Sequence, residues 1–195
     1  MSRWLAAGLL FIASVGAWAQ DGLPCRHPKT QEDLPQVLGP GFVRQGTHDY
    51  EAEMRGGGCS VRYKHPSGMW ADVYIYRAEL GVIEDVPRDP RLMNEFQQTM
   101  GGIVQGWKQR HGGIVRDSQG QYLERGQAHV EVMVGSAVIE VPQVMTYRTH
   151  VQLWSGGGSI WKLRATFPVS DQAASDPAVE ALGSALVDLS REVPL

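Results

Sequence analysis

The sequence predicts an α+β domain in which an antiparallel β-sheet meander has two amphipathic helices packed on it. Two observations lead to this fold class. Segments of alternating apolar and polar residues occur in two groups with hairpin-length connections, and each group is followed by one segment of helical periodicity. A doubly wound parallel sheet is excluded because it needs a helix between successive strands.

The first group of strands begins after the turn Gly39-Pro40-Gly41. Its last member is rich in Val, Ile, Tyr and Trp, the residues that favour a half-buried strand. In this strand Ala71, Val73 and Ile75 alternate with Trp70, Asp72, Tyr74 and Tyr76, so one face belongs to the core and the other carries aromatic side chains and one carboxylate. The expected ranges are 42–45, 50–54, 59–64 and 69–77.

Each expected helix opens with Asp-Pro, which supplies an N-cap and a proline at the first helical position. Asp89-Pro90 starts a helix that runs to Gly112-Gly113, with one apolar stripe that includes Met100 and Trp107. Gly101-Gly102 lies inside this helix, and we expect the helix to pack closely on a strand there. Asp176-Pro177 starts the second helix, which continues almost to the end of the sequence.

The second group of strands lies between the two helices. Gly120, Gly126 and Pro142 separate its earlier members, and Gly156-Gly157-Gly158 forms the turn of a long final hairpin. The expected ranges are 114–117, 121–124, 129–136, 144–154 and 159–167.

Residues 1–19 have the pattern of a secretory signal peptide. Arg3 is followed by the uncharged apolar run from Leu5 to Val15 and by the small-x-small site Ala17-Trp18-Ala19. We therefore expect an exported bacterial protein of the periplasm, with secretion as the alternative. A retained membrane anchor is the other interpretation of this segment, although the apolar run is short for a span. Lipidation at Cys25 is disfavoured by Leu23-Pro24 before it.

The segment 20–40 is polar and proline-rich, and we expect an irregular lead-in with one helical turn over 30–38. Cys25 and Cys59 are the two cysteines of the chain. In an oxidising compartment such a pair predicts a disulfide, which would tie the lead-in to a single domain over 41–195. The rival interpretation is a redox or metal-binding thiol pair, but the sequence has no C-x-x-C spacing.

The charge of the chain argues against a nucleic-acid partner. The formal net charge is −3 at pH 7, and the longest basic cluster is Lys108-Gln109-Arg110-His111. This cluster falls at an expected helix end, where cations complement the helix dipole.

Several segments together resemble a family of exported bacterial proteins. They are Val73-Tyr74-Ile75-Tyr76 with Leu80-Gly81 and Ile83, the helix start Asp89-Pro90, and the strand Trp161-Lys162-Leu163-Arg164-Ala165-Thr166. The architecture implied is similar to the α/β/α sandwich of the photosystem subunit PsbP and the Ran-binding protein Mog. The resemblance spans residues 63–167 and concerns structural positions, so it implies a fold and no catalytic residue.

No motif predicts a metal, a cofactor or a catalytic centre. The histidines lack the spacing of a zinc site, no G-x-S-x-G elbow is present, and both triple glycines lack the Lys-Ser/Thr of a P-loop. The histidines are His27, His48, His65, His111, His129 and His150.

The candidate binding surface is a polar, aromatic face of the sheet. A carboxylate and several cations among aromatic rings would suit an anionic ligand or the edge of a peptide. The alternative is a solvated sheet face with weak cross-strand ion pairs. The candidate residues are Arg62, Trp70, Asp72, Tyr74, Tyr76, Arg148, His150 and Arg164, with Lys64 and Lys162 as further cations.

Two functions remain from these observations. The first is a non-enzymatic binding or accessory module that recognises an envelope protein, as an inhibitor would. The second is a carrier of a small apolar ligand or lipid, with a cavity between the sheet and helix 90–111 and with walls from Met100, Trp107 and Met133. An enzyme is a third and weaker interpretation, because no acid, base and orienting group are visible together.

Overall fold

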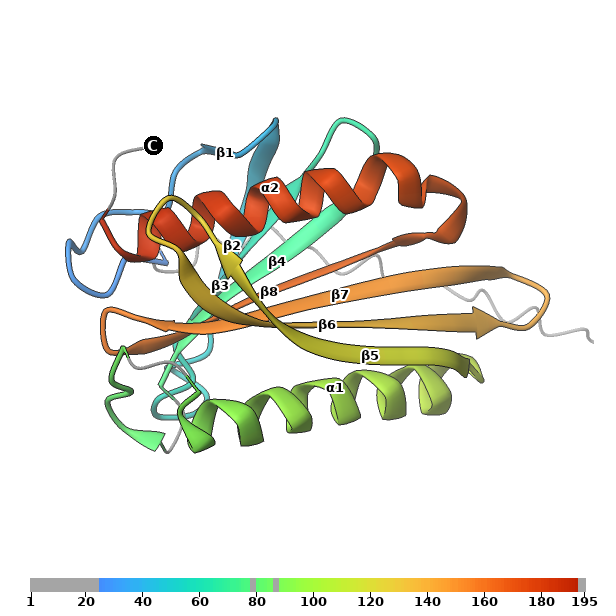
Figure 1. Cartoon of the computed structure of the whole chain (residues 1–195), viewed down its shortest axis with the longest axis horizontal. Helices are drawn as coiled ribbons and strands as arrows, with labels where there is room; N and C mark the ends of the chain where they lie inside the picture. The colour runs from blue at the N-terminus through green and yellow to red at the C-terminus, as the bar shows by residue number, and fades with distance from the viewer. Residues whose placement is uncertain (1–24, 78–79, 86–87, 193–195) are drawn as a thin grey trace, which may run out of the picture.

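The computed structural model describes residues 25–77, 80–85 and 88–192. The expected signal peptide at 1–19 lies outside these residues. The chain forms one eight-stranded sheet and two long helices, as the expected α+β class requires (Figure 1). The elements are β1 (Val37–Leu38), β2 (Phe42–Asp49), β3 (Cys59–Lys64), β4 (Trp70–Tyr76), α1 (Pro90–His111), β5 (Ile114–Arg125), β6 (Val130–Val141), β7 (Met145–Gly156), β8 (Ser159–Pro168) and α2 (Gln172–Ser190).

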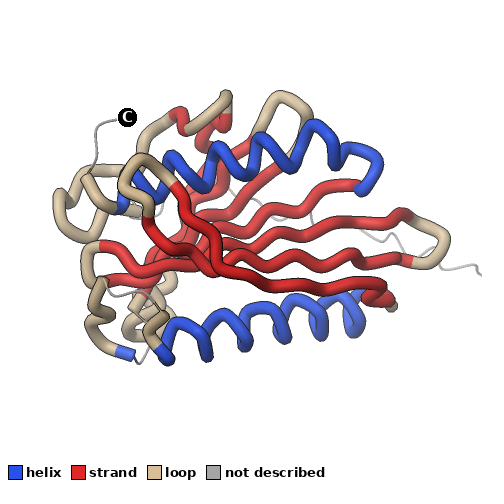
Figure 2. The backbone as a smooth tube through the Cα atoms, in the orientation of Figure 1, coloured by secondary structure: helices blue, strands red, loops and turns tan. Residues whose placement is uncertain are grey.

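The strands are antiparallel in the order β1-β2-β3-β4-β8-β7-β6-β5. Figure 2 shows them in red as one layer between the two blue helices. Two meanders therefore meet where β4 pairs with β8. The register there sets Asp72 opposite Arg164 and Tyr74 opposite Lys162, so these side chains share one face.

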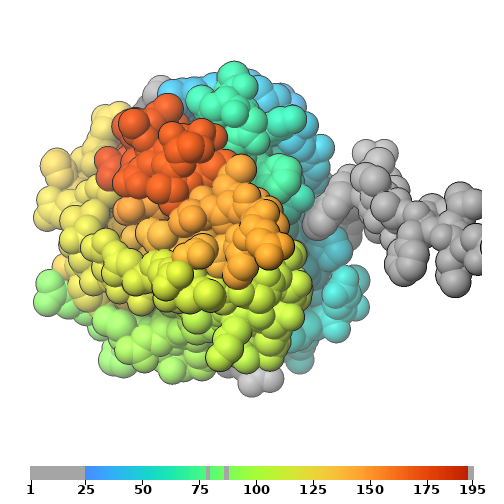
Figure 3. Space-filling model, turned by 90° about the vertical axis from the view of Figure 1, so that its right-hand side faces the viewer, coloured from blue at the N-terminus to red at the C-terminus, as the bar shows by residue number. Residues whose placement is uncertain are grey.

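The helices lie on opposite faces of the sheet. In the end view, red α2 and the yellow-green residues of α1 and β5 flank the orange ends of the strands (Figure 3). The α2 side holds the largest core, which includes the buried Trp154, Trp161, Leu182 and Leu186. On the other side, Leu92 and Ile103 of α1 pack into two smaller clusters over the second meander.

Both ends of α1 agree with the sequence. The Asp89 side chain accepts a hydrogen bond from the Arg91 amide, and Gly112 ends the helix with φ 61°. The close packing expected at Gly101-Gly102 is wrong, because a Cβ at either position would meet no atom within 4 Å. These glycines lie where the helix faces open space.

The second helix starts earlier than predicted. It begins at Gln172, and Pro177 lies inside it. Asp176 therefore lies within the helix and does not cap it, and its carboxylate lies 2.9 Å from His150 Nε2 on β7. An Asp-Pro pair predicts a helix start from local sequence alone, and here the pair lies in the first turns of a longer helix in which Asp176 contacts a strand.

The lead-in joins the core through a disulfide and a short strand. Cys25 and Cys59 form the expected disulfide, with Cα atoms 5.4 Å apart. The helical turn expected over 30–38 is wrong, because this segment contains a bridge from Asp33 to Arg26 and the strand β1. Leu34 and Leu38 are buried in the core beneath α2.

Two strand predictions also need correction. Residues 50–54 form a turn, in which the Met54 amide donates to the Tyr50 carbonyl, and not a strand. The break expected at Gly120 is absent, since β5 is continuous from Ile114 to Arg125. Gly120 leaves room for the ring of Phe96, which packs over the strand from α1. An added Cβ at Gly120 would lie 3.3 Å from this ring.

Candidate functional site

Among the described residues, α1 covers only part of the sheet on its side. The helix packs mainly on β6 and β7, so the neighbouring strands β8, β4 and β3 present this face beside it. Six of the predicted candidates share that face through strand register. They are Arg62, Trp70, Asp72, Tyr74, Tyr76 and Arg164, and Lys162 lies among them.

Arg148 and His150 do not belong to this surface. The register pairs them with Phe167 and Ala165, whose side chains point to the α2 side. Alternation along β7 predicts that Arg148 and His150 share one face of the sheet, and they do. It does not tell which of the two faces this is, and the prediction chose the α1 side instead of the α2 side.

The two misplaced residues form a separate polar contact with α2. His150 Nε2 lies 2.9 Å from Asp176 Oδ1, and the same nitrogen lies 2.9 Å from Arg148 Nε. Burial lowers the pKa of His150, whereas Asp176 opposes this shift and Arg148 adds to it. His150 is only 8% exposed, so this contact is part of the interior.

On the α1 side, Arg62 and Asp72 neutralise each other. Arg62 Nε donates to Asp72 Oδ1 at 2.7 Å and Nη2 donates to Oδ2 at 3.0 Å. This forked bond raises the pKa of Arg62. The guanidinium also lies 5.5 Å from the centre of the Trp70 ring, which is exposed.

Lys162 has a different environment from the cations of the ion pairs. Its ammonium lies 4.9 Å from the centre of the Tyr74 ring and 4.7 Å from that of Tyr76. Burial lowers the pKa of Lys162, Glu95 partly offsets this, and Arg164 lowers the pKa further. Within the described part of the chain, no hydrogen bond or ion pair holds its ammonium.

The tyrosines beneath Lys162 are also largely buried. Burial raises the pKa of Tyr74 to about 12. Burial is the main reason that the pKa of Tyr76 is raised as well, and its hydroxyl donates to Glu95 of α1 at 2.6 Å. The Glu95 carboxylate is therefore hydrogen-bonded to Tyr76, and it acts on Lys162 only through its negative charge, without a direct ion pair.

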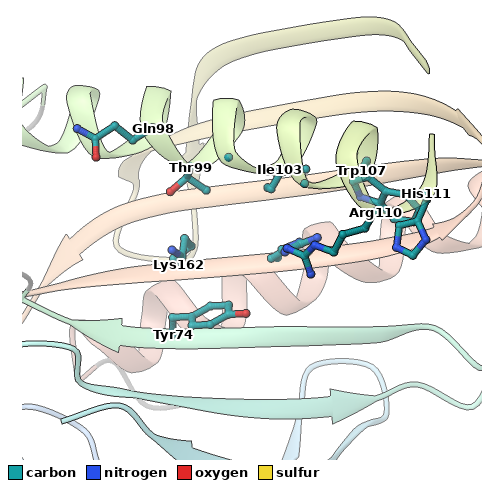
Figure 4. Close-up of a pocket in the computed structure, with 11 residues that line it drawn as sticks. Tyr74, Gln98, Thr99, Ile103, Trp107, Arg110, His111 and Lys162 are labelled. Carbon is teal, nitrogen blue, oxygen red and sulfur yellow. The ribbon is translucent and has the colours of Figure 1, made fainter. Parts of the chain in front are cut away.

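A cleft of about 330 Å³ lies between α1 and this sheet face (Figure 4). Tyr74, Lys162 and Arg164 form its floor, and α1 contributes Gly102, Gly106 and Arg110 to its wall. We call this space the α1 cleft. In Figure 4 Arg110 reaches back beneath the helix over the sheet, while Tyr74 and Lys162 rise from neighbouring strands.

Two further hollows lie beside the α1 cleft on the same face. A hollow of about 630 Å³ shares Tyr74, Trp107 and Arg164 with it. A smaller one, of about 80 Å³, lies over β2 and β3 and is lined by Arg62, Asp72 and Tyr74 among others. Tyr74 borders all three, so the hollows are neighbours around one aromatic ring.

The comparisons with known proteins add a fold and no function. No family model matches the sequence, and no match is found among curated proteins. Among solved structures, the chain is similar to the solution structure of cyanobacterial PsbP (CyanoP) from Synechocystis sp. PCC 6803. The identity is 8% and the TM-score 0.43, over 75% of this chain and 81% of that one. The likeness is thus weak and concerns the arrangement of strands and helices alone.

The walls expected for an apolar carrier are largely occupied by packing. Met100 lies against Gly135 of β6, where a Cβ would come within 2.9 Å of its sulfur. Trp107 packs on the cluster beneath α1, its ring 5.1 Å from that of Tyr147. Met133 is buried in the other small cluster. The open volume lies beside the helix, next to cations.

Trp107, one of the walls expected for a cavity between the sheet and helix 90–111, lines the α1 cleft, whereas Gly102, Gly106 and Arg110 were not expected there. Arg110 was assigned to the helix end, and the glycines were assigned to close packing. Gly102, Gly106 and Arg110 recur every four residues, which places them along one side of a helix, and this spacing is the signal that could have found the wall of the cleft.

In the ranges 25–77, 80–85 and 88–192, no three His, Cys, Asp or Glu side chains gather where they could hold a metal ion. Within these ranges, neither α1 nor α2 has the length and apolar character needed to cross a bilayer.

Proposed function

We propose that this protein is a non-enzymatic binding module of the bacterial cell envelope, and that it binds its ligand or partner in the α1 cleft. The observation that carries this proposal is the sheet face beside α1, where Tyr74 borders three neighbouring hollows and where cations and aromatic rings line the walls. Clefts that are part apolar and contain a few placed polar groups are the usual binding sites of proteins.

The α1 glycines support this location. Gly102 and Gly106 form part of the wall, and the space before Gly102 is empty of atoms within 4 Å of an added Cβ. Each glycine in a helix interior lowers helix stability by about 0.5–1 kcal/mol relative to alanine. At Gly102 this lower stability coincides with a wall that has no side chain to fill the cleft.

Blocking the cleft tests the proposal. Gly102→Phe places a ring in the cleft wall, whereas Gly101→Phe places the same ring on the adjacent exposed position that does not line the cleft. Immobilised wild-type protein and both variants are exposed to an envelope extract, and the retained components are compared by mass spectrometry. We expect to find extract components that bind to the wild type and to Gly101→Phe but do not bind to Gly102→Phe. Identical retention by all three proteins would contradict the cleft as the binding site.

The envelope location is part of the proposal. The Cys25–Cys59 disulfide supports it, since disulfides persist in oxidising compartments. The mass of the protein isolated from the periplasmic fraction is the test. A chain that begins at Gln20 with both cysteines oxidised supports export and cleavage, whereas a full-length chain in the cytoplasm contradicts them.

A further inference from the structure

We propose that the α1 cleft takes a small organic anion with a flat ring, whose carboxylate or phosphate is held by Lys162 and Arg164. This inference rests on the proposed function, because it names the ligand class of the same site.

The side chains that line the cleft carry a net positive charge. Arg110, Lys162 and Arg164 all line the cleft, and none of its lining residues is an Asp or a Glu. Lys162 and Arg164 are two residues apart on one strand, so their Cα atoms are about 6.6 Å apart and both side chains point to the same side. An anion between them would meet both cations.

The neighbouring acids are already engaged. Asp72 lies opposite Arg164, but both of its oxygens accept from Arg62. Glu95 accepts from the Tyr76 hydroxyl and from Thr99 Oγ1 at 3.5 Å, and it is not part of the cleft lining. Among the described residues, neither Lys162 nor Arg164 has an ion pair or a hydrogen bond through its side chain. The positive charge in the cleft is thus left for a ligand.

The partly buried position of Lys162 makes this charge significant. In a space screened from water, opposite charges attract more strongly than at an open surface. Its contacts with the rings of Tyr74 and Tyr76 fix the ammonium from below. A ligand anion would approach from the cleft side, where the wall at Gly102 has no side chain.

The ring of the ligand is inferred from the aromatic lining and from the volume. Tyr74 borders the cleft from the sheet and Trp107 borders it from α1. Offset or edge-to-face contact between rings contributes about 0.5–1.5 kcal/mol beyond area burial. The volume of the α1 cleft, about 330 Å³, lies at the small end of ligand sites and accommodates one compact molecule.

The test is a titration of the folded protein with probes that differ in charge and share one ring. The probes are benzoate and phenyl phosphate as anions, benzyl alcohol as a neutral analogue and benzylamine as a cation, with inorganic phosphate as the anion without a ring. Binding is followed by NMR shifts of assigned backbone amides and of the Trp107 indole. We expect saturable shifts around the cleft with the two aromatic anions, and affinities lower by at least about tenfold for the other three probes.

Matched variants assign the charge to its residues. Lys162→Met keeps the length of the side chain and removes the ammonium, and it should weaken benzoate binding by about tenfold. Lys108→Met is the control. It removes an exposed cation in the last turn of α1 that does not line the cleft, and it should leave benzoate binding unchanged. Unchanged binding in Lys162→Met, or equal loss in Lys108→Met, would overturn the assignment.

Other outcomes separate this inference from the proposed function. Equal binding of benzoate, benzyl alcohol and benzylamine would overturn the anion preference while leaving the cleft as a site. Binding of a glutamate-rich peptide without binding of benzoate would also overturn it, in favour of an acidic protein segment. Gly102→Phe should abolish the benzoate shifts and Gly101→Phe should not, and shifts that persist in Gly102→Phe would count against the cleft itself.

Discussion

Arg62 and Asp72 face each other across β3 and β4 and form a forked ion pair, with both carboxylate oxygens within 3.0 Å of a guanidinium nitrogen. Sequence alternation alone placed both residues on the candidate surface without revealing that they bind each other. The pair neutralises the middle of that surface, so the unbalanced positive charge lies nearer to α1, at Lys162 and Arg164.

Replacing the acid of this pair should weaken the fold and make the surface more positive. Asp72→Asn removes a partly buried, bidentate interaction, and we expect a loss of about 1 kcal/mol in the free energy of unfolding. Urea denaturation measures this loss. Glu140→Gln, which breaks the more exposed Arg116 pair, is the control and should cost less. Equal losses would show that the geometry of the Arg62 pair adds nothing.

The disulfide should contribute strongly to stability. It closes a sequence separation of 34 residues, for which the chain-entropy model gives about 3–4 kcal/mol. Cys25→Ser should therefore lower the urea midpoint markedly. Replacing both cysteines should lower the free energy of unfolding by no more than replacing one, because either change opens the same loop. Quantitative thiol titration of the unfolded wild-type protein should find no free thiol.

The glycines of α1 and its end should respond to alanine in opposite directions. Gly101→Ala and Gly102→Ala meet no atom within 4 Å and should each raise the free energy of unfolding by about 0.5–1 kcal/mol. Gly113→Ala should lower it, because the new Cβ would lie 2.9 Å from Ile139 Cγ2. Thermal unfolding of the three variants gives the comparison. Destabilisation by Gly102→Ala would show that the helix packs more closely than described.

His150 should make stability depend on pH. Burial lowers its folded pKa below the unfolded value of 6.5, so the unfolded chain binds more protons in the window between these two values. Stability therefore falls as the pH drops through about 6.5, and the loss stops growing once the pH is below the folded pKa. Arg148, Asp176 and Glu180 surround this imidazole and set the size of the shift.

The measurement is the difference in unfolding free energy between wild type and His150→Gln as a function of pH. The difference cancels the contribution of His27, whose pKa is also lowered by burial. We expect the advantage of the wild type to shrink from pH 7 to pH 5. A difference that is constant over this range would contradict the burial of a neutral imidazole.

The fold class followed from the sequence because the signals that carry it are local. Alternation in 70–76 and the Asp89-Pro90 start are properties of short segments, and both elements are present. Boundaries failed where a distant element decided the outcome. Phe96 of α1 packs over Gly120 in the continuous strand β5, and His150 of β7 binds Asp176 within α2.

The candidate surface was only partly predictable for a related reason. The residues of β3, β4 and β8 were grouped correctly, because in-register strands carry same-face residues opposite one another. Arg148 and His150 lie on the other face, and of the α1 residues that line the cleft only Trp107 was expected. Which side of a sheet a helix covers, and how far it extends, depends on packing that no single segment encodes.

The pairing of β4 with β8 sets a condition on when the cleft can exist. Tyr74 and Lys162 are opposite one another in the sheet although the whole of α1 and three strands lie between them in the chain. Contacts of such long sequence separation form only after the intervening loop has closed, which is a slow part of folding. Neither half of the chain has both sides of the floor, so binding of an anion in the cleft would report that β4 has paired with β8. The same titration that identifies a ligand would then serve as a folding assay for fragments and destabilised variants.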